Sequence, residues 1–373
     1  MAFGIFFVTF LTFLASIIYY LKRRLRKRQE NLIDRIFVAG AMIFVSPNQK
    51  EIESWEELYE TPPDIIEMIF IANIFPSKDD WQILRTFPEL HFLNFLSTKL
   101  CDRDFFSILN IRGTKIKRIG FNNENMITGI NIPVLNRLPD LEELYFINCP
   151  QLKGKYFRNL PSFSLYGLMI VGCPITDEHL LDFPILRGLD WITLEELDIT
   201  DSISLFFEDH CPNLTQISVA KTKCTGKIIR KLRHPRQITS LNLSDLDVTD
   251  EDMKHLRRFI GLTTLTLENT GITDASLPIL IGLPFLMTCH VEGTKLSDEG
   301  KEQLKKYLDK SKKQAELINF SSNAKEDEHQ DEFDHIISFD QDNNERQHRF
   351  RGNLPQSGSD RRKEQSRREE RTQ

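Results

Sequence analysis

Apolar residues recur along this chain in one short pattern that returns at a nearly constant interval. Its clearest copy has apolar residues at Leu262, Leu265, Leu267 and Ile272, followed by a Thr-Asp pair at 273–274. The second and third of these are two residues apart, so both point to one side of a short strand. After the Thr-Asp pair the apolar spacing becomes helical, and a Thr or Asp oxygen at that step can cap a first helical turn. Each copy therefore predicts one strand followed by one helix.

Ten copies can be followed, and they form one continuous array. We place their first residues at Ile66, Leu90, Ile116, Leu141, Leu165, Leu194, Leu214, Ile238, Leu262 and Leu286. The differences between successive numbers are 24, 26, 25, 24, 29, 20, 24, 24 and 24. The 29 and the 20 flank the copy at Leu194, so either an outer loop is longer there or that copy is placed a few residues off. A period of this length is typical of a solenoid, in which no coil buries its apolar side alone.

The array predicts about ten parallel strands with shared columns of core residues. Four residues that occupy one template position in successive copies should form a buried column: Ile217, Leu241, Leu265 and Cys289.

The pattern resembles the leucine-rich repeats, and more narrowly the L-x-x-L-x-L-x-x-T-x-I-T-D repeats common in planctomycete bacteria. The matching residues are those from Leu262 to Asp274 and, in an earlier copy, Leu165, Leu168, Ile170, Cys173, Ile175, Thr176 and Asp177. Many such proteins begin with a hydrophobic span, a basic run and a short helix, and this chain has the same order. The resemblance implies an α/β leucine-rich-repeat solenoid, a curved parallel sheet with helices on the convex side, preceded by one transmembrane helix. Glu124, Ser202 and Leu246 depart from the usual Thr, and the copy at Ile116 lacks the Ile-Thr-Asp step.

Residues 3–21 carry no charge and are long enough to span a bilayer as a helix. No Lys or Arg precedes them and no clear cleavage site follows, which favours an uncleaved anchor over a signal peptide. Six Lys or Arg residues lie between Lys22 and Arg28. The positive-inside tendency puts that flank on the cytoplasmic side. The sequence therefore predicts a single-pass membrane protein with a cytoplasmic repeat domain.

Four segments follow from these patterns. They are a transmembrane anchor at 1–21, a basic juxtamembrane segment and N-terminal cap at 22–64, the repeat domain at 65–312 and a charged tail at 313–373. Within the tail, residues 326–342 hold eight acids and no base, and residues 346–371 hold nine bases and four acids. So few apolar residues cannot offset the entropy of ordering, and we expect the tail to be disordered.

The search for chemistry finds no catalytic or nucleotide-binding motif. The net charge of −6 argues against a dedicated nucleic-acid binder. The six cysteines lack zinc-site spacing, and Cys149 and Cys173, which are equivalent in adjacent copies, are either a disulfide or two buried thiols. His290 lies on an exposed strand position, where a lone histidine is usually only solvated. We expect no catalysis, cofactor, metal, nucleic acid or small-molecule substrate.

The surface left for function is the concave face of the sheet. Its early positions are apolar or aromatic: Met68, Phe70, Phe92, Leu96, Tyr145, Ile147, Met169 and Val171. Its later positions are polar and slightly acidic: Glu196, Asp198, Gln216, Ser218, Asn242, Thr264, Thr266 and Glu268. An exposed apolar patch tends to mark an interaction site, unless the segment 43–59 folds over it as a cap.

These features favour a membrane-tethered scaffold for an unknown protein partner. The candidate partner-binding residues are Met68, Phe70, Phe92, Tyr145, Ile147 and Met169. One alternative is the recognition arm of a multiprotein enzyme, similar to a ubiquitin-ligase adaptor, although no helical docking box is apparent between Gln29 and Pro62. The other is an enzyme with its site on the concave face.

Overall fold

The structure is a computed structural model that describes residues 42–45, 50–51, 66–72, 89–109, 115–162 and 164–322. The chain divides between Asp140 and Leu141 into two compact units, called here the first and the second unit. The hydrophobic span 3–21, the basic run 22–28 and the charged tail from residue 323 onward lie outside the described residues. None of the helices in the described ranges combines the length and the apolar character needed to cross a membrane.

The first unit contains the first three coils of the array and an edge strand. Its elements are β1 (Met42–Val45), β2 (Lys50–Glu51), β3 (Ile66–Ala72), β4 (Phe92–Leu96), α3 (Asp102–Leu109), β5 (Arg118–Asn122) and the 3-10 helix η3 (Ile132–Arg137). Strands β3, β4 and β5 are parallel, and Ile69, Leu93 and Ile119 lie side by side in them, each almost fully buried. Strand β1 pairs antiparallel with β2 and β3. The described part of the predicted cap therefore extends the sheet at its edge.

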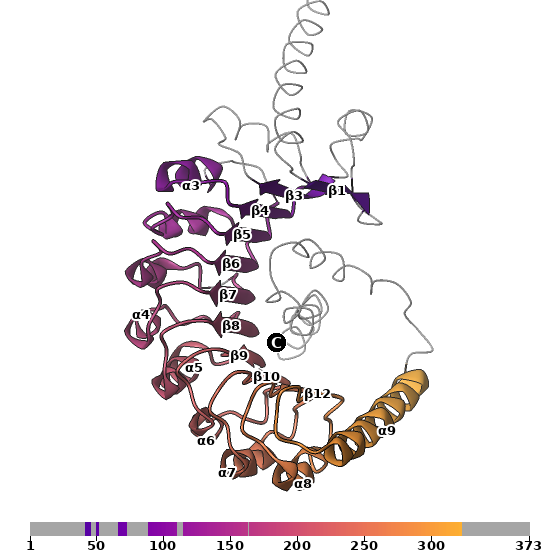
Figure 1. Ribbon diagram of the computed structural model, residues 1–373. Coiled ribbons are helices and arrows are strands. Elements are labelled where there is room, and N and C mark those ends of the chain that lie inside the picture. The colour runs from indigo at the N-terminus through magenta and orange to yellow at the C-terminus, as the bar shows by residue number, and fades with distance from the viewer. Residues whose placement is uncertain are drawn as a thin grey trace, which may run out of the picture. The chain divides into compact units, whose positions relative to one another are not determined.

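The second unit is a stack of seven parallel strands, each paired with the next along the chain. These are β6 (Glu143–Ile147), β7 (Gly167–Val171), β8 (Trp191–Glu195), β9 (Gln216–Ser218), β10 (Ser240–Asn242), β11 (Thr264–Thr266) and β12 (Thr288–His290). In this unit the strands line the inner side of the curve and the helices lie on its outer side (Figure 1).

Short helices follow most strands of the second unit. They are η4 (Gly154–Asn159), α4 (Asp177–Leu181), η5 (Asp201–Ile203), α5 (Ser204–His210), α6 (Lys227–Lys231), α7 (Asp250–Met253), η6 (Lys254–Arg258), η7 (Asp274–Ser276), α8 (Leu277–Leu280) and the long α9 (Asp298–Ser322). Helix α9 continues beyond residue 312, where the sequence analysis ended the repeat domain.

The predicted core column is present in the second unit. Ile217, Leu241, Leu265 and Cys289 are direct neighbours in the strand pairings. The first three are at most 3% exposed, and Cys289, in the last strand, is half-buried. A second layer of contacts lies toward the helices, where Phe157 stacks on Phe183 with ring centroids 4.9 Å apart and Phe183 meets Phe206 edge-on at 5.5 Å. Successive coils therefore interlock on both sides of the core.

The copy placed at Leu194 is wrong by five positions and begins at Leu189. Ile192 pairs with Leu168 on one side and with Ile217 on the other, so it is the residue that follows the coil's first leucine by three. The coil then begins 24 residues after Leu165 and 25 residues before Leu214. These intervals match the rest of the array and replace the irregular 29 and 20. The error arose because apolar residues at 189, 192, 194, 197 and 199 fit the template in two frames. Ser202 is consequently not a template position, and Leu197 stands there instead.

A recurrent backbone turn confirms the new frame. Seven positions after each coil's start the backbone is left-handed, at Ser97, Asn123, Asn148, Gly172, Glu196, Lys221, Asp245, Asn269 and Gly293. Glu196 falls in this series only if its coil begins at Leu189. Such a conformation suits Gly, Asn and Asp, which explains most of these residue types.

At four of the steps between described coils, the Asp that ends the template ties its coil to the next one. The Asp250 carboxylate accepts hydrogen bonds from the backbone N–H of Thr273 at 2.9 Å and from its hydroxyl at 2.8 Å. The same two hydrogen bonds, from a threonine N–H and its hydroxyl to an aspartate of the preceding coil, join three other pairs. These are Asp102 with Thr128, Asp177 with Thr200, and Asp201 with Thr225. Thr249 also forms a capping box with Asp252. The predicted cap is therefore one of two functions of this motif, and the second is a tie between coils.

Glu124 stands at the template position where the usual residue is Thr, and its side chain connects its coil to the preceding one by other hydrogen bonds. Its carboxylate is fully buried and accepts hydrogen bonds from the backbone N–H of Thr98 at 2.7 Å, the Thr98 hydroxyl at 2.8 Å and the N–H of Leu100 at 3.0 Å. Burial raises the pKa of this carboxyl, and the three hydrogen bonds act in the opposite direction.

The two cysteines left open by the sequence are both free, buried thiols. The backbone N–H of Cys149 lies 3.5 Å from the sulfur of Cys173. They are ladder residues of adjacent coils rather than a disulfide.

The tie at Asp250 can be tested by substitution. Asp250→Ala should lower the free energy of unfolding by about 1.5–3 kcal/mol at pH 7, because it removes charge-assisted hydrogen bonds to Thr273 and Ser276. The control is Asp247→Ala, whose exposed side chain lies in the same coil and should change stability little. The measurement is chemical denaturation of the full chain. Equal losses for both variants would contradict the tie.

The stability that the Asp250 carboxylate contributes should depend on pH. Desolvation raises the pKa of Asp250, but hydrogen bonds from Ser276 and Thr273 outweigh it, so the pKa lies below its ordinary value. A depressed pKa stabilises the fold above the unfolded value and ceases to do so as pH falls through the folded value. The stability difference between wild type and Asp250→Ala should thus shrink below about pH 4. A difference that grows with acidification would be inconsistent with this assignment.

Candidate functional site

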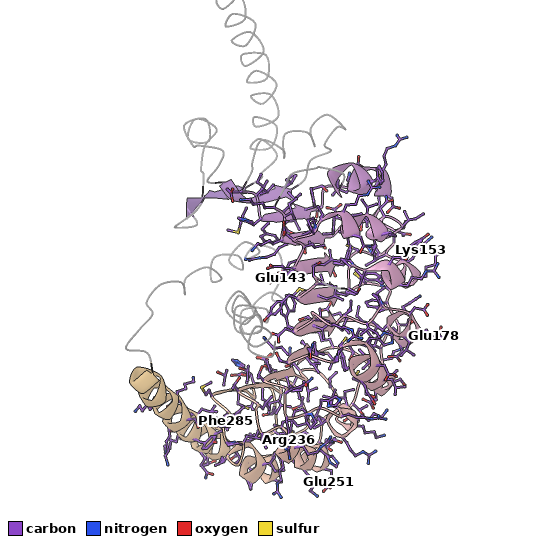
Figure 2. All side chains as sticks on the ribbon, turned by 180° about the vertical axis from the view of Figure 1, so that it is seen from behind. Glu143, Lys153, Glu178, Arg236, Glu251 and Phe285 are labelled. Atoms are coloured by element: carbon purple, nitrogen blue, oxygen red, sulfur yellow. The ribbon has the colours of Figure 1, made fainter. Side chains whose placement is uncertain are left out.

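The inner face of the second unit is formed by residues that alternate with the core residues of each strand. In β6 to β8 these are Glu143, Tyr145, Ile147, Gly167, Met169, Val171, Trp191, Thr193 and Glu195. Figure 2 shows Glu143 on this strand side, whereas Lys153 and Glu178 lie on the outer, helical side. The inner face is therefore where three neighbouring coils present side chains to one another.

Apolar and aromatic residues gather there into a group that we name the inner-face cluster. Its members are Tyr145, Ile147, Tyr166, Met169, Val171 and Trp191. Met169, Val171 and Trp191 are at most 5% exposed, and the other three are half-buried around them. The cluster combines a buried centre with a partly exposed margin, which suits a contact surface better than a surface of scattered apolar residues.

Trp191 is the largest member of the inner-face cluster, and Gly167 makes room for it. The two residues are direct partners in the pairing of β7 with β8. A Cβ atom on Gly167 would lie 2.1 Å from the indole ring, which is too close for any side chain. The ring centroid of Trp191 lies 6.0 Å from that of Tyr145.

The indole nitrogen of Trp191 is a buried donor without a hydrogen-bond partner among the described residues. Tryptophan N–H groups usually find a partner when they are buried. This nitrogen is closed to solvent and lies beside Gly167, so it belongs to the buried centre of the inner-face cluster and not to its exposed margin.

Carboxylates hold both tyrosines of the cluster by their hydroxyl groups. Tyr145 donates to Glu143, and Tyr166 donates to Asp190 at 2.6 Å. Asp190 also accepts from the Thr215 hydroxyl at 2.8 Å. These bonds orient the rings and place negative charge beside the aromatic surface.

Farther along the sheet the inner face is polar. Glu195 accepts hydrogen bonds from the Ser218 hydroxyl and from the Asn242 side-chain amide. Burial raises the pKa of Glu195, while Ser218 and Lys221 act in the opposite direction. Across the seven coils no inner-face position holds Lys or Arg, and those that carry a formal charge are Glu143, Glu195, Glu268 and Glu292. The face is therefore acidic as well as apolar.

The structure brings together half of the predicted partner-binding residues. Tyr145, Ile147 and Met169 lie in the inner-face cluster. Met68 and Phe92 are direct partners in the first unit, 8% and 6% exposed. Phe70 lies on β3 opposite Asn94, and its side chain lies outside the described residues.

Glu196 and Asp198 are not inner-face strand residues, because the coil begins at Leu189. They follow β8 and form ion pairs with Lys221 at 3.0 Å and Lys223 at 2.6 Å. The two positions that they were given belong to Trp191 and Thr193, and Glu195 is the next inner-face residue of the same strand; none of the three was named from the sequence. The frame that starts at Leu189 would have found them.

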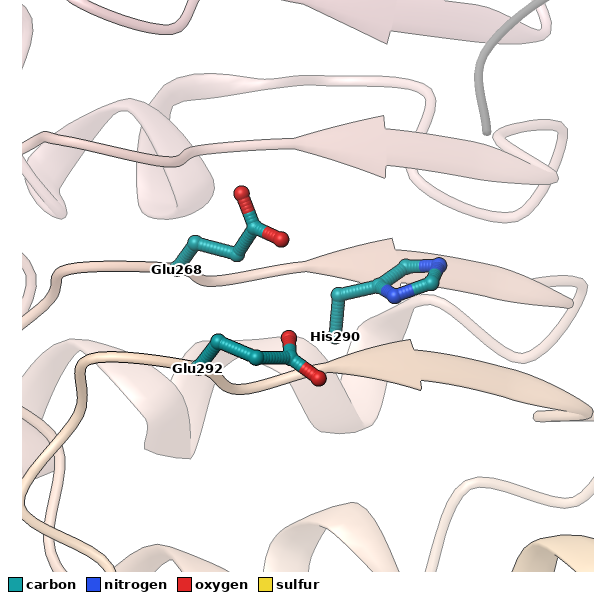
Figure 3. Close-up of side chains that lie close together, drawn as sticks. All are labelled: Glu268, His290 and Glu292. Atoms are coloured by element: carbon teal, nitrogen blue, oxygen red, sulfur yellow. The ribbon is translucent and has the colours of Figure 1, made fainter. Parts of the chain in front are cut away.

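A second group of functional side chains lies near the other end of the sheet. Glu268, His290 and Glu292 each offer one ligand atom, and these atoms all lie within 4.8 Å of one another (Figure 3). His290 is half-buried rather than isolated in solvent. Nothing in the sequence pairs it with Glu268, because Glu268 belongs to the preceding coil and meets His290 only through coil stacking.

No model of a protein family matches this chain, and no curated protein matches it. Among solved structures, an internalin from Listeria monocytogenes is similar at 16% identity and a TM-score of 0.38, over 70% of this chain and 89% of that one. The TLR13-ssRNA13 complex is similar at 17% identity and a TM-score of 0.43, over 62% of this chain and 37% of that one. Leiomodin-1 Actin-Binding Site 2 is similar at 12% identity and a TM-score of 0.26, over 33% of this chain and 77% of that one.

These values are too low to assign an activity or a partner to this chain. The class of the fold rests on the coils themselves. Parallel strands and short helices, stacked at a nearly constant period around shared leucine columns, are the architecture of an α/β leucine-rich-repeat solenoid.

Proposed function

We propose that this chain is a membrane-tethered protein-protein interaction scaffold that binds its partner on the inner face of β6 to β8. The observation that carries the proposal is the inner-face cluster, in which the partly exposed Tyr145, Ile147 and Tyr166 surround a buried centre that includes Trp191. Tryptophan and tyrosine are the residue types that most often dominate the binding energy of protein interfaces.

The chemistry of the face indicates what the partner segment contains. The cluster offers apolar and aromatic contact area through its partly exposed margin. Glu143, Asp190 and Glu195 place negative charge around it, and no inner-face strand position of the second unit holds Lys or Arg. A segment with aliphatic or aromatic residues next to Lys or Arg is complementary to this surface.

Met68, Phe70 and Phe92 stay candidates for partner binding in the first unit, because they occupy the corresponding strand positions there. The proposal involves no catalytic step, cofactor, nucleic acid or small-molecule substrate.

The proposal of a membrane anchor is based on the sequence. The uncharged span 3–21 and the six basic residues between Lys22 and Arg28 support a single-pass anchor with the repeats on the cytoplasmic side. Anchoring would confine the inner face to partners that are present near the membrane.

The binding face is tested with Tyr145→Ala. The full chain, purified in detergent micelles, is used to select binders from a random peptide library, and affinities are then measured by fluorescence anisotropy. Selected peptides should be rich in Lys or Arg beside apolar residues, and Tyr145→Ala should weaken their binding about tenfold or more. The half-buried tyrosine should cost no more than about 1 kcal/mol of folding stability.

Thr264→Ala is the control for that experiment, since Thr264 lies on the same face in a coil remote from the cluster. It should leave the binding of the selected peptides unchanged. Peptides that bind Tyr145→Ala as tightly as wild type would exclude the inner-face cluster as their site. A large loss of thermal stability in Tyr145→Ala would assign this residue to the core.

The orientation is tested by protease protection. Protease added to intact cells should leave the repeat domain whole, and detergent permeabilisation should expose it to cleavage. Replacing the basic residues between Lys22 and Arg28 with neutral ones should produce mixed orientations, because the charge asymmetry is lost. Complete cleavage in intact cells would place the repeats on the opposite side.

A further inference from the structure

We propose that Glu268, His290 and Glu292 form a binding site for a divalent transition-metal ion such as Zn²⁺. The site is distinct from the inner-face cluster and is independent of the proposed scaffold function. It lies on the inner face at β11 and β12 (Figure 3).

Coil stacking explains how the three side chains meet. Glu268 and Glu292 occupy the same template position in adjacent coils. His290 precedes Glu292 by two positions in its coil, so both side chains point to the same face. Each residue contributes one ligand atom, and all three atoms lie within 4.8 Å of one another. Small side-chain rotations would bring them to the separations found around a tetrahedral ion.

The electrostatics of the site favour a cation. Two carboxylates at equivalent positions of neighbouring strands repel each other, since strands lie only about 4.8 Å apart. The strand positions of the second unit that face this side carry no Lys or Arg. Among the described residues Glu292 forms no ion pair. A divalent ion would neutralise both carboxylates at once.

The donor set selects the type of metal. Imidazole nitrogen suits zinc and other late first-row ions, whereas Ca²⁺ and Mg²⁺ prefer oxygen ligands alone. Three protein ligands leave one position of a tetrahedral ion for water or for a group from another molecule. A bound ion would also link the last two strands, β11 and β12, through their side chains.

The test uses the full chain with a tag that contains no histidine, stripped of metal with chelator and titrated with Zn²⁺ by calorimetry at pH 7. Wild type should bind one equivalent of Zn²⁺ more than the His290→Gln variant does. It should also bind one equivalent more than the Glu292→Gln variant does. The difference between proteins isolates this site, because the cysteines and the remaining histidines are common to all of them. His255→Gln, on η6 of the outer side, is the control and should bind as wild type does.

A second readout follows unfolding. Saturating Zn²⁺ should raise the unfolding temperature of wild type and of His255→Gln more than that of His290→Gln, since an ion bound only to the folded state stabilises it. Equal zinc stoichiometry in wild type and His290→Gln would overturn the proposal, as would unaltered binding by Glu292→Gln. An equal rise in unfolding temperature for wild type and His290→Gln would overturn it too.

Discussion

The stacking of each coil on the next is the interaction on which the rest of this structure depends. A single coil cannot bury its apolar side alone, so it is stable only against a neighbour. Two kinds of hydrogen bond hold the neighbours in place: the parallel strand pairing on the inner side, and the Asp-to-Thr tie represented by Asp250 and Thr273 on the outer side. Between them, columns such as Ile217, Leu241 and Leu265 are closed to solvent. Because both sides are tied, the coils cannot slide relative to one another without breaking many bonds.

This constraint also creates the functional surfaces, because it brings together residues that are one full coil apart in the sequence. Trp191 lies against Gly167 only because β8 follows β7 in strict order, and Glu268 meets Glu292 for the same reason. A large residue requires a small one in the adjacent coil, and two like charges at equivalent positions of adjacent coils repel each other. Each proposed site is therefore formed by residues from adjacent coils, and neither site could exist within one coil.

Much of the fold could be predicted from the sequence, since the period and the strand-facing leucines are strictly local signals. The column through Leu265 and the helix after each Thr-Asp pair were predicted from spacing alone. The frame at Leu189 was not, because the apolar residues at 189, 192, 194, 197 and 199 fit the template in two frames and only strand pairing decides between them. The outer tie of Asp250 and the buried carboxylate of Glu124 were also missed, since each bonds to a residue in another coil. Four of the six residues of the inner-face cluster were placed on the concave face from the sequence, among them Tyr145 and Met169, whereas Trp191 depends on the frame.

The frame at Leu189 is the claim on which the site most directly rests, and a cysteine cross-link tests it. The structure places Met169 opposite Thr193, and Asp198 opposite Thr176. Paired strand residues lie about 4.8 Å apart, within the range that a disulfide bridges. Two full-length variants, Met169→Cys with Thr193→Cys and Met169→Cys with Asp198→Cys, are oxidised and mapped by peptide mass spectrometry. The account predicts a disulfide in the first variant and none in the second, whereas a disulfide in the second alone would contradict it.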